Sequence, residues 1–279
     1  MIAAVAVAVV HSLWQGVVAF ALVKGADAIV DPRHAGTRHA VRVLALAGLV
    51  VAFAVGVGTG AGTTHLASSV PGWVPVVGGL WCLGAALCAS SAAIGWLRLW
   101  RWRRESLAVP AAVQAIADEV AAALSIASVA VREHARVAVP CVVSAVHPVV
   151  LLPLAWASRV EPSVLRVALV HELVHVRRRD PWIAIVVVVG RVVLFHHPVA
   201  WWLGAQIERE REFACDAEAA QLCGGRLAYG RGLLALEEGR APASSWAPAA
   251  THGALAERVA RLVGRRPGRT GAARRWWLV

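Results

Sequence analysis

The sequence predicts a mostly α-helical membrane protein in which three N-terminal transmembrane helices precede an α+β domain. Two observations carry this fold class. The 279 residues are 58% hydrophobic with a mean hydropathy of +0.62, which is more apolar than an ordinary soluble domain. Short valine-rich runs between residues 128 and 152 then separate longer helical patterns, which indicates a small sheet among helices.

The three spans follow from the distribution of charged residues. Residues 1–23 contain no Asp, Glu, Lys or Arg, and residues 43–97 form a second charge-free stretch, far longer than the roughly 20 residues of one span. Gly, Thr, Ser and Pro gather in its middle, at residues 58–72, so spans are expected near 3–23, 43–57 and 73–97. A cleavable signal peptide is the alternative for the first span, but it lacks a basic n-region and an A-x-A site.

Basic residues set the expected orientation. The segment between spans one and two and the segment after span three are basic, whereas residues 58–72 carry no charge. The basic residues are Lys24, Arg33, Arg38 and Arg42, then Arg98, Arg101, Arg103 and Arg104. The N-terminus should therefore lie outside and everything after about residue 98 in the cytoplasm, with Trp96, Trp100 and Trp102 as an aromatic belt. This gives a multi-pass cell-membrane protein with a membrane domain at 1–104, a cytoplasmic domain at 105–264 and a basic tail at 265–279.

The net charge of +11 comes almost wholly from arginine, since Lys24 is the single lysine. The arginines are spread over membrane flanks, helix ends and the tail, and do not form one stripe with interleaved aromatics. Contact with anionic lipid is therefore expected, and direct nucleic-acid binding is not. The five cysteines are odd in number and lack C-x-x-C spacing, so we expect reduced thiols.

After span three, residues 110–124 have helical spacing. Valine-rich runs at 129–131, 137–139 and 149–152, in a segment broken by Pro140 and Pro148, predict the strands of a small sheet. An exposed edge of that sheet could hold an extended peptide by backbone pairing, or the strands could simply cover a helix. The sequence leaves both possibilities open.

Pro162 suits the first turn of a helix that continues to residue 178, and Asp180-Pro181 resembles an N-cap followed by a first-turn proline. Residues 182–205 are apolar enough for a fourth span, but His196-His197-Pro198 interrupts them. A bilayer crossing would carry all later residues about 30 Å from the preceding helix, which contains His171 and His175. No later residue could then bind a metal ion together with these two histidines. We therefore expect two helices, 182–195 and 199–220, that fold back, the first in or against the membrane surface.

The most informative stretch is His171-Glu172-Leu173-Val174-His175. Two histidines four residues apart share one face of a helix and can bind zinc, while the intervening glutamate can serve as the base of a peptidase. A catalytic zinc usually takes a third protein ligand. The sequence thus predicts a zinc site with one protein ligand still to be placed.

Three acidic residues at a spacing of four, Glu208, Glu212 and Asp216, supply candidates on the later helix. We expect Glu212 as the third ligand, Asp216 as the residue that holds a ligating histidine in position, and Glu208 as the reserve ligand. The alternative is an exposed acidic face balanced by Arg209 and Arg211. Tyr229 could donate a hydrogen bond to an oxyanion, although packing is the more common role for such a residue, and His196 and His197 are expected to be turn or packing residues.

Ordered motifs across most of the chain resemble the BlaR/MecR-type integral-membrane zinc metallopeptidases. The matching segments are His11 to Gly16 (HSLWQG), Val139 to Pro153, His171 to His175, His197 to Trp201 (HPVAW) and Glu212 to Asp216 (EFACD). Ser144 and His147 stand where the family often has glycine and arginine.

The resemblance implies a gluzincin-like cytoplasmic domain that binds Zn²⁺ through His171, His175 and Glu212, with Glu172 catalytic and Cys215 a buried thiol. It also implies a protein substrate, for which a cytoplasmic winged-helix repressor is the candidate. Neither a penicillin-binding sensor domain nor an S-x-x-K nucleophile is present in these 279 residues, so β-lactam acylation is not expected. The alternatives are a quality-control metallopeptidase of membrane proteins and a noncatalytic, zinc-stabilised signalling scaffold.

Overall fold

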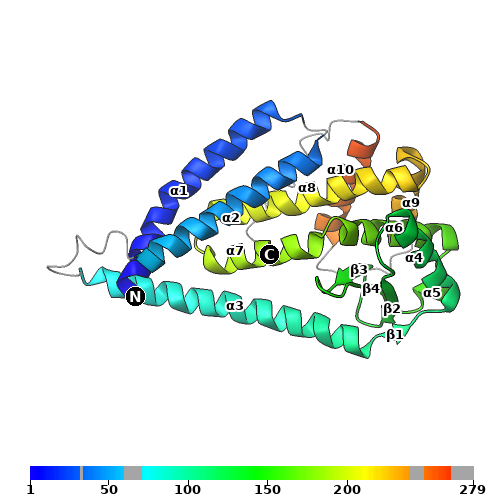
Figure 1. Ribbon diagram of the computed structural model, residues 1–279, viewed down its shortest axis with the longest axis horizontal. Helices are drawn as coiled ribbons and strands as arrows, with labels where there is room; N and C mark the ends of the chain where they lie inside the picture. The colour runs from blue at the N-terminus through cyan, green and yellow to red at the C-terminus, as the bar shows by residue number, and fades with distance from the viewer. Residues whose placement is uncertain (32–33, 60–70, 239–247, 265–279) are drawn as a thin grey trace. The chain divides into compact units, whose positions relative to one another are not determined.

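The computed structural model describes residues 1–31, 34–59, 71–238 and 248–264, with side chains from residue 255 onward in the last helix (Figure 1). Three apolar N-terminal helices lead into a mixed region of helices and a small sheet, which confirms the predicted fold class. The basic tail 265–279 and most of the 58–72 and 240–248 segments lie outside the described residues.

The three N-terminal helices are α1 (Ile2–Ile29), α2 (Ala35–Thr59) and α3 (Trp73–Glu105), each long and apolar enough to cross a membrane. They exceed the predicted spans because the helical backbone continues beyond the apolar residues into polar flanks. Arg42 illustrates this: it is 2% exposed on α2, and its Nη2 donates to Asp27 Oδ1 of α1 at 2.7 Å. An ion pair thus joins α1 and α2 next to their apolar contact.

Residues 180–222 form two helices, α7 (Asp180–Val193) and α8 (Pro198–Leu222), which confirms the predicted break. Pro198 opens α8, where its missing N–H costs no helical hydrogen bond. The described residues divide into two compact units: 1–95 with 183–211, and 96–182 with those between 212 and 264. Leu46, Leu194 and Leu203 are fully buried in the core of the first unit.

The second unit contains a four-stranded sheet in the order β1-β2-β4-β3. β2 and β4 are parallel, and β1 and β3 pair antiparallel with their neighbours, so β3 forms one edge of the sheet. The strands are β1 (Leu107–Ala108), β2 (Ala130–His134), β3 (Cys141–Val143) and β4 (Val149–Pro153).

One predicted strand is wrong. Residues 137–139 have no regular structure: they follow the turn at 135–136, which the bond from Val137 N–H to His134 O closes at 3.2 Å, and the strand starts only at Cys141. Pro140 lacks the N–H that a paired strand donates, so regular pairing begins after it. The sequence also did not predict β1. A strand of two residues after a long helix is too short to show the alternating pattern of a strand.

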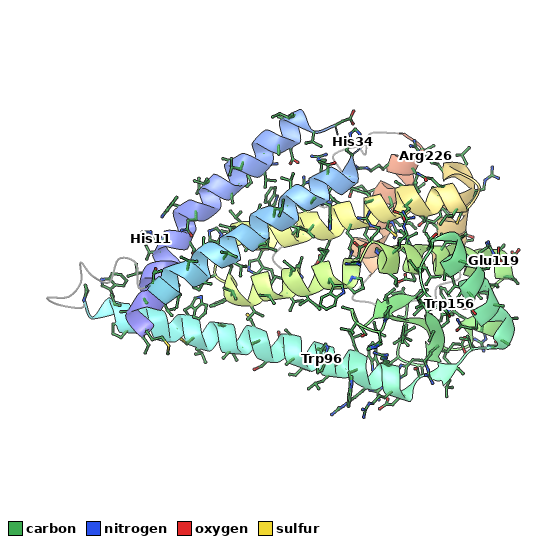
Figure 2. The ribbon with its side chains drawn as sticks, viewed as in Figure 1. His11, His34, Trp96, Glu119, Trp156 and Arg226 are labelled. Atoms are coloured by element: carbon green, nitrogen blue, oxygen red, sulfur yellow. The ribbon has the colours of Figure 1, made fainter. Side chains whose placement is uncertain are left out.

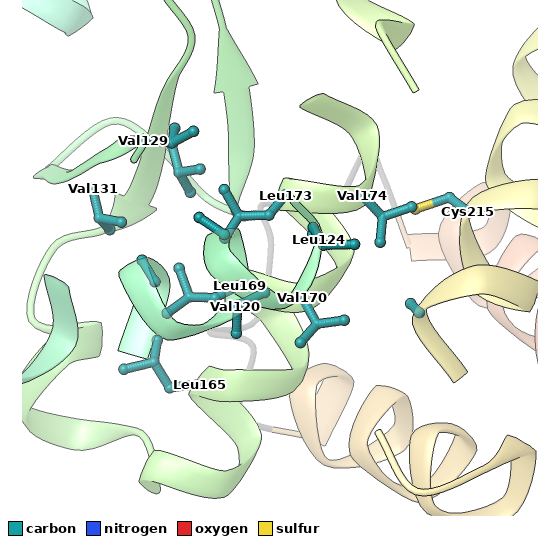
Figure 3. Close-up of a cluster of buried hydrophobic side chains, with 14 of the residues drawn as sticks. Val120, Leu124, Val129, Val131, Leu165, Leu169, Val170, Leu173, Val174 and Cys215 are labelled. Carbon is teal, nitrogen blue, oxygen red and sulfur yellow. The ribbon is translucent and has the colours of Figure 1, made fainter. Parts of the chain in front are cut away.

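Helices cover this sheet and form the core of the second unit. Leu165, Leu169 and Leu173 lie on one face of α6 and pack with Val120 of α4 and Val131 of β2 (Figure 3). That face is fully buried, so the residues of α6 that point elsewhere are free to form a site. The remaining helices are α4 (Ala111–Ala123), α5 (Trp156–Arg159), α6 (Pro162–Arg177), α9 (Arg226–Glu238) and α10 (Pro248–Leu262).

Candidate metal centre

His171 and His175 lie one turn apart on α6, and their Nε2 atoms are 3.2 Å from each other. A spacing of four residues places them on the same face of the helix. His171 is 9% exposed and Glu172, between them in sequence, is 8% exposed. The pair therefore presents two nitrogen donors toward one point in a largely desolvated environment.

Glu212 of α8 completes this arrangement. Its Oε2 is 3.5 Å from His171 Nε2 and its Oε1 is 3.7 Å from His175 Nε2. Burial would raise the pKa of Glu212, but the hydrogen bond and charge of His171, the charge of His175 and that of Arg258 together lower it. The structure thus brings the three sequence-predicted ligands together around one point, with the third as a carboxylate.

The far ring nitrogen of His175 is held by Asp180, the first residue of α7. Its Oδ2 accepts a hydrogen bond from His175 Nδ1 at 2.7 Å and another from Arg178 Nε at 3.3 Å. Proton donation from Nδ1 leaves the lone pair of Nε2 directed at the site. The sequence interpretation of Asp180 as only an N-cap missed this role, for which an aspartate five residues after the second histidine was the available signal.

The far ring nitrogen of His171 is held by Tyr229 of α9. The Tyr229 hydroxyl accepts from His171 Nδ1 at 2.8 Å and donates to Asp216 Oδ1 at 2.8 Å. Burial and the charge of Asp216 raise the pKa of the phenol, which keeps its proton in this chain of bonds. Packing alone is thus the wrong interpretation of Tyr229, and Asp216 reaches His171 chiefly through it, since its own Oδ1 lies 3.6 Å from Nδ1.

Arg258 of α10 binds Asp216, the last residue of the hydrogen-bonded series from His171 through Tyr229. Its Nη2 and Nε donate to the two oxygens of Asp216 at 2.6 and 2.8 Å, and its Nη1 lies 3.7 Å from Glu212 Oε2. Burial alone would lower the pKa of Arg258, but the hydrogen bond and charge of Asp216 raise it overall. Sequence reasoning missed Arg258, because it lies 42 residues after Asp216 with no motif to connect them.

Cys215 is the remaining candidate metal-binding side chain. His171, His175 and Cys215 are close enough together to hold a metal ion. However, the Cys215 thiol lies 3.3 Å from Nδ1 of His171, the nitrogen that Tyr229 already engages, and it donates to the His171 carbonyl at 3.3 Å. Burial raises the pKa of the thiol. Glu212, which faces both Nε2 atoms, is the better third donor.

The other residues that the sequence singled out are Glu208, His197 and Glu172, and each has its own surroundings. Glu208, the reserve ligand, belongs to the first unit, where it pairs with Arg191 at 2.9 Å. His197 is a turn residue that donates from Nε2 to Ser12 O at 2.9 Å. Glu172 lies on α6, which contacts β3; burial, and after it the charge of Glu172, raises the pKa of the Cys141 thiol on β3 to about 12.

A histidine pair and a carboxylate that face one another, in a chain with three membrane-length helices, are an arrangement typical of a membrane-associated metallopeptidase. The model of the BlaR1 peptidase M56 family matches residues 6–262, and the chain belongs to this family. The match covers both units and all residues of the metal centre. A search of curated proteins found no match.

Proposed function

We propose that this protein is a zinc-dependent endopeptidase in which His171, His175 and Glu212 hold the metal and Glu172 is the catalytic base. One observation carries the proposal: two Nε2 atoms and a carboxylate converge within 3.2 to 3.7 Å while both Nδ1 atoms are already engaged. Two imidazoles and one carboxylate are a common protein ligand set of catalytic zinc, which leaves further positions for water and substrate.

The residues around the site fit a catalytic zinc ion better than a zinc ion with a purely structural role. Each histidine has a hydrogen-bond acceptor on its far nitrogen, the arrangement that orients zinc-binding imidazoles. Bound zinc would supply Lewis acidity toward a carbonyl and lower the pKa of a water to about 7. Glu172 would accept the proton of that water and deliver it to the leaving amine. A scaffold that only binds zinc has no need of this carboxylate.

The edge strand β3 is the proposed substrate-binding element. It lies at one edge of the described sheet and contacts α6, the helix that carries Glu172. An extended peptide that paired with this edge would place its carbonyl groups beside the metal centre. A protein substrate with an accessible extended segment is therefore the class that we propose.

We further propose that the centre faces the cytoplasm and serves signalling by cleavage of a transcriptional repressor. The orientation rests on the basic flanks of α1 and α3, and the signalling role on the family. Degradation of damaged membrane proteins is the second candidate, because it would use the same chemistry on the same side of the membrane.

The test compares the full-length protein, Glu172→Gln and the control Glu119→Gln, in detergent. Glu119, labelled in Figure 2, is an exposed acidic residue of α4 that pairs with Arg166 and is not a residue of the candidate metal centre. Zinc content is measured by elemental analysis, and cleavage is measured on a casein-like substrate and on a winged-helix repressor encoded nearby.

Zinc in all three proteins, with cleavage lost only in Glu172→Gln, is the expected result. Absence of zinc from the wild-type protein would contradict the metal centre. Zinc without cleavage of either substrate by wild-type protein would contradict the peptidase assignment as tested and favour the scaffold. Cleavage of casein but not of the repressor would count against the signalling role.

A further inference from the structure

The second unit has a pocket between the polar end of α3 and the sheet. It has a volume of about 490 Å³ and is lined by Trp100, Arg103, Arg104, Ala130, Arg132 and Val149. The first three residues come from α3, the next two from β2 and the last from β4. None of these six residues belongs to the metal centre.

The pocket has a strong excess of positive charge. Three of its six lining residues are arginines and none is acidic. Within the described part of the chain, none of the three arginines forms an ion pair, and Nε of Arg132 is buried without a hydrogen-bond partner. Three guanidinium groups around one cavity repel each other unless an anion lies among them. The pocket is thus electrostatically complementary to an anionic ligand.

The walls of the pocket suit a ligand that is only partly polar. The Arg104 guanidinium lies 3.8 Å from the centroid of the Trp100 ring, which fixes both side chains by a cation–π contact. Ala130 and Val149 add apolar surface. A volume of about 490 Å³ is in the range of small-molecule sites and far exceeds one phosphate ion.

The position of the pocket along α3 indicates the source of the anion. α3 is one continuous helix whose charge-free stretch ends at Leu97. At 1.5 Å per residue, Arg103 and Arg104 lie about 10 Å beyond that point, near the level of phospholipid headgroups. Trp96, exposed on the same helix, belongs to the aromatic belt expected at this level (Figure 2).

We propose that this pocket binds the phosphate headgroup of an anionic phospholipid. Arg103, Arg104 and Arg132 hold the phosphate oxygens, and Trp100 packs against the glycerol backbone. Guanidinium groups suit this role because their planar donors match phosphate oxygens in pairs. The lipid would attach the sheet of the second unit to the end of α3 that leaves the membrane.

The test uses native mass spectrometry of the full-length protein in detergent, titrated with phosphatidylglycerol or phosphatidylcholine. The triple variant Arg103→Gln, Arg104→Gln, Arg132→Gln removes the charges of the pocket. The matched control, Arg98→Gln, Arg101→Gln, Arg136→Gln, removes the same charge from exposed positions outside it. A third variant, Ala130→Leu, keeps every charge and fills the cavity from an exposed position on β2.

The proposal predicts that wild type and the matched control retain phosphatidylglycerol in preference to phosphatidylcholine. The pocket variant and Ala130→Leu should each bind phosphatidylglycerol at least about tenfold more weakly. Because Ala130→Leu leaves the arginines in place, it keeps the proposal testable if the triple variant fails to fold.

Equal binding by the pocket variant and the matched control would overturn the proposal in favour of nonspecific charge attraction. Displacement of the lipid by millimolar inorganic phosphate would overturn the lipid as the source and indicate a free-phosphate site. Zinc content, which this pocket does not affect, reports separately on the metal centre.

Discussion

The two histidines of the centre are held by different acceptors. His175 donates directly to the carboxylate of Asp180, whereas His171 donates to the neutral hydroxyl of Tyr229, which passes the interaction to Asp216. A carboxylate acceptor increases the basicity of an imidazole more than a hydroxyl does. His175 should therefore be the stronger metal ligand of the pair.

Substitution of Asp180 by Asn tests this difference. The variant keeps the size of the side chain but removes the charge that His175 Nδ1 contacts at 2.7 Å, so zinc affinity should fall by about tenfold or more. Affinity is measured by competition with a chromophoric chelator. Asp118→Asn, at an exposed site that pairs with Ser128, is the matched control. Equal affinities in the two variants would show that Asp180 does not tune the ligand.

Arg258→Gln should weaken the fold around the centre. Asp216 is 2% exposed and takes two hydrogen bonds from Arg258, so loss of the guanidinium leaves a buried carboxylate without its countercharge. We expect a loss of about 3 kcal/mol in the free energy of unfolding. Denaturant unfolding in detergent measures this change, with Arg261→Gln, a neighbour that lies over the Phe213 ring, as control.

A double variant separates the pair from its surroundings. If the charge of Asp216 causes the loss, Asp216→Asn should destabilise the Arg258→Gln protein less than it destabilises the wild type. Strictly additive changes would show that Arg258 acts through packing alone.

The residues that sequence could bring together are those with regular spacing. His171 and His175 share a helix face, and a spacing of four led to Glu212 and Asp216, which the structure places at the same centre. Asp180, Tyr229 and Arg258 could not be found in this way. Each reaches the centre from a different helix, at a distance that only the packing of α7, α9 and α10 determines.

At the scale of elements, the helix α6 was predictable from its sequence, whereas the sheet was predictable only in part. Leu165, Leu169 and Leu173 repeat at four residues and bury one face, and this periodicity is strong enough to predict the helix. Strands of three to five residues give a weaker signal, and valine content alone placed one of them four residues too early. Proline, which ends regular pairing, was the better guide to where β3 begins.

The contact of α1 with the turn before α8 depends on Gly16. A Cβ at Gly16 would overlap the imidazole of His197, whose Nε2 donates to Ser12 O at 2.9 Å and whose Nδ1 accepts from Val199 N–H at 3.1 Å. The ring is therefore fixed at both nitrogens and cannot easily move aside. Gly16 permits a close approach of two elements far apart in sequence.

Gly16→Ala should accordingly lower the thermal unfolding midpoint. Gly25→Ala on the same helix is the control, because a Cβ there has no atom within 4 Å and alanine favours the helix by about 1 kcal/mol. The two variants should shift the midpoint in opposite directions in detergent. A rise in both would mean that α1 and the turn do not pack closely in solution.

At the scale of the whole molecule, the charge distribution predicts the orientation in the membrane. Arg38 and Arg42 of α2 both contact Asp27, yet acidic residues count little in the positive-inside rule, so the basic flanks still favour the cytoplasmic side. α3, at 33 residues, is about 50 Å long and exceeds the hydrocarbon core of about 30 Å. Its two ends should therefore emerge on opposite sides.

Cysteine reporters test this orientation in a background where Cys82, Cys88, Cys141 and Cys223 are each replaced by alanine and only the buried Cys215 is kept. Gly72→Cys precedes α3, and Ala135→Cys lies in the turn after β2; both sites are exposed. A membrane-impermeant maleimide should label Gly72→Cys in intact cells, and Ala135→Cys only after lysis. The reverse pattern would place the candidate metal centre outside the cell, where a cytoplasmic repressor could not reach it, while the peptidase chemistry proposed for Glu172 would be unaffected. The labelling pattern thus decides the side on which the substrate must be sought, independently of whether the centre cleaves peptides.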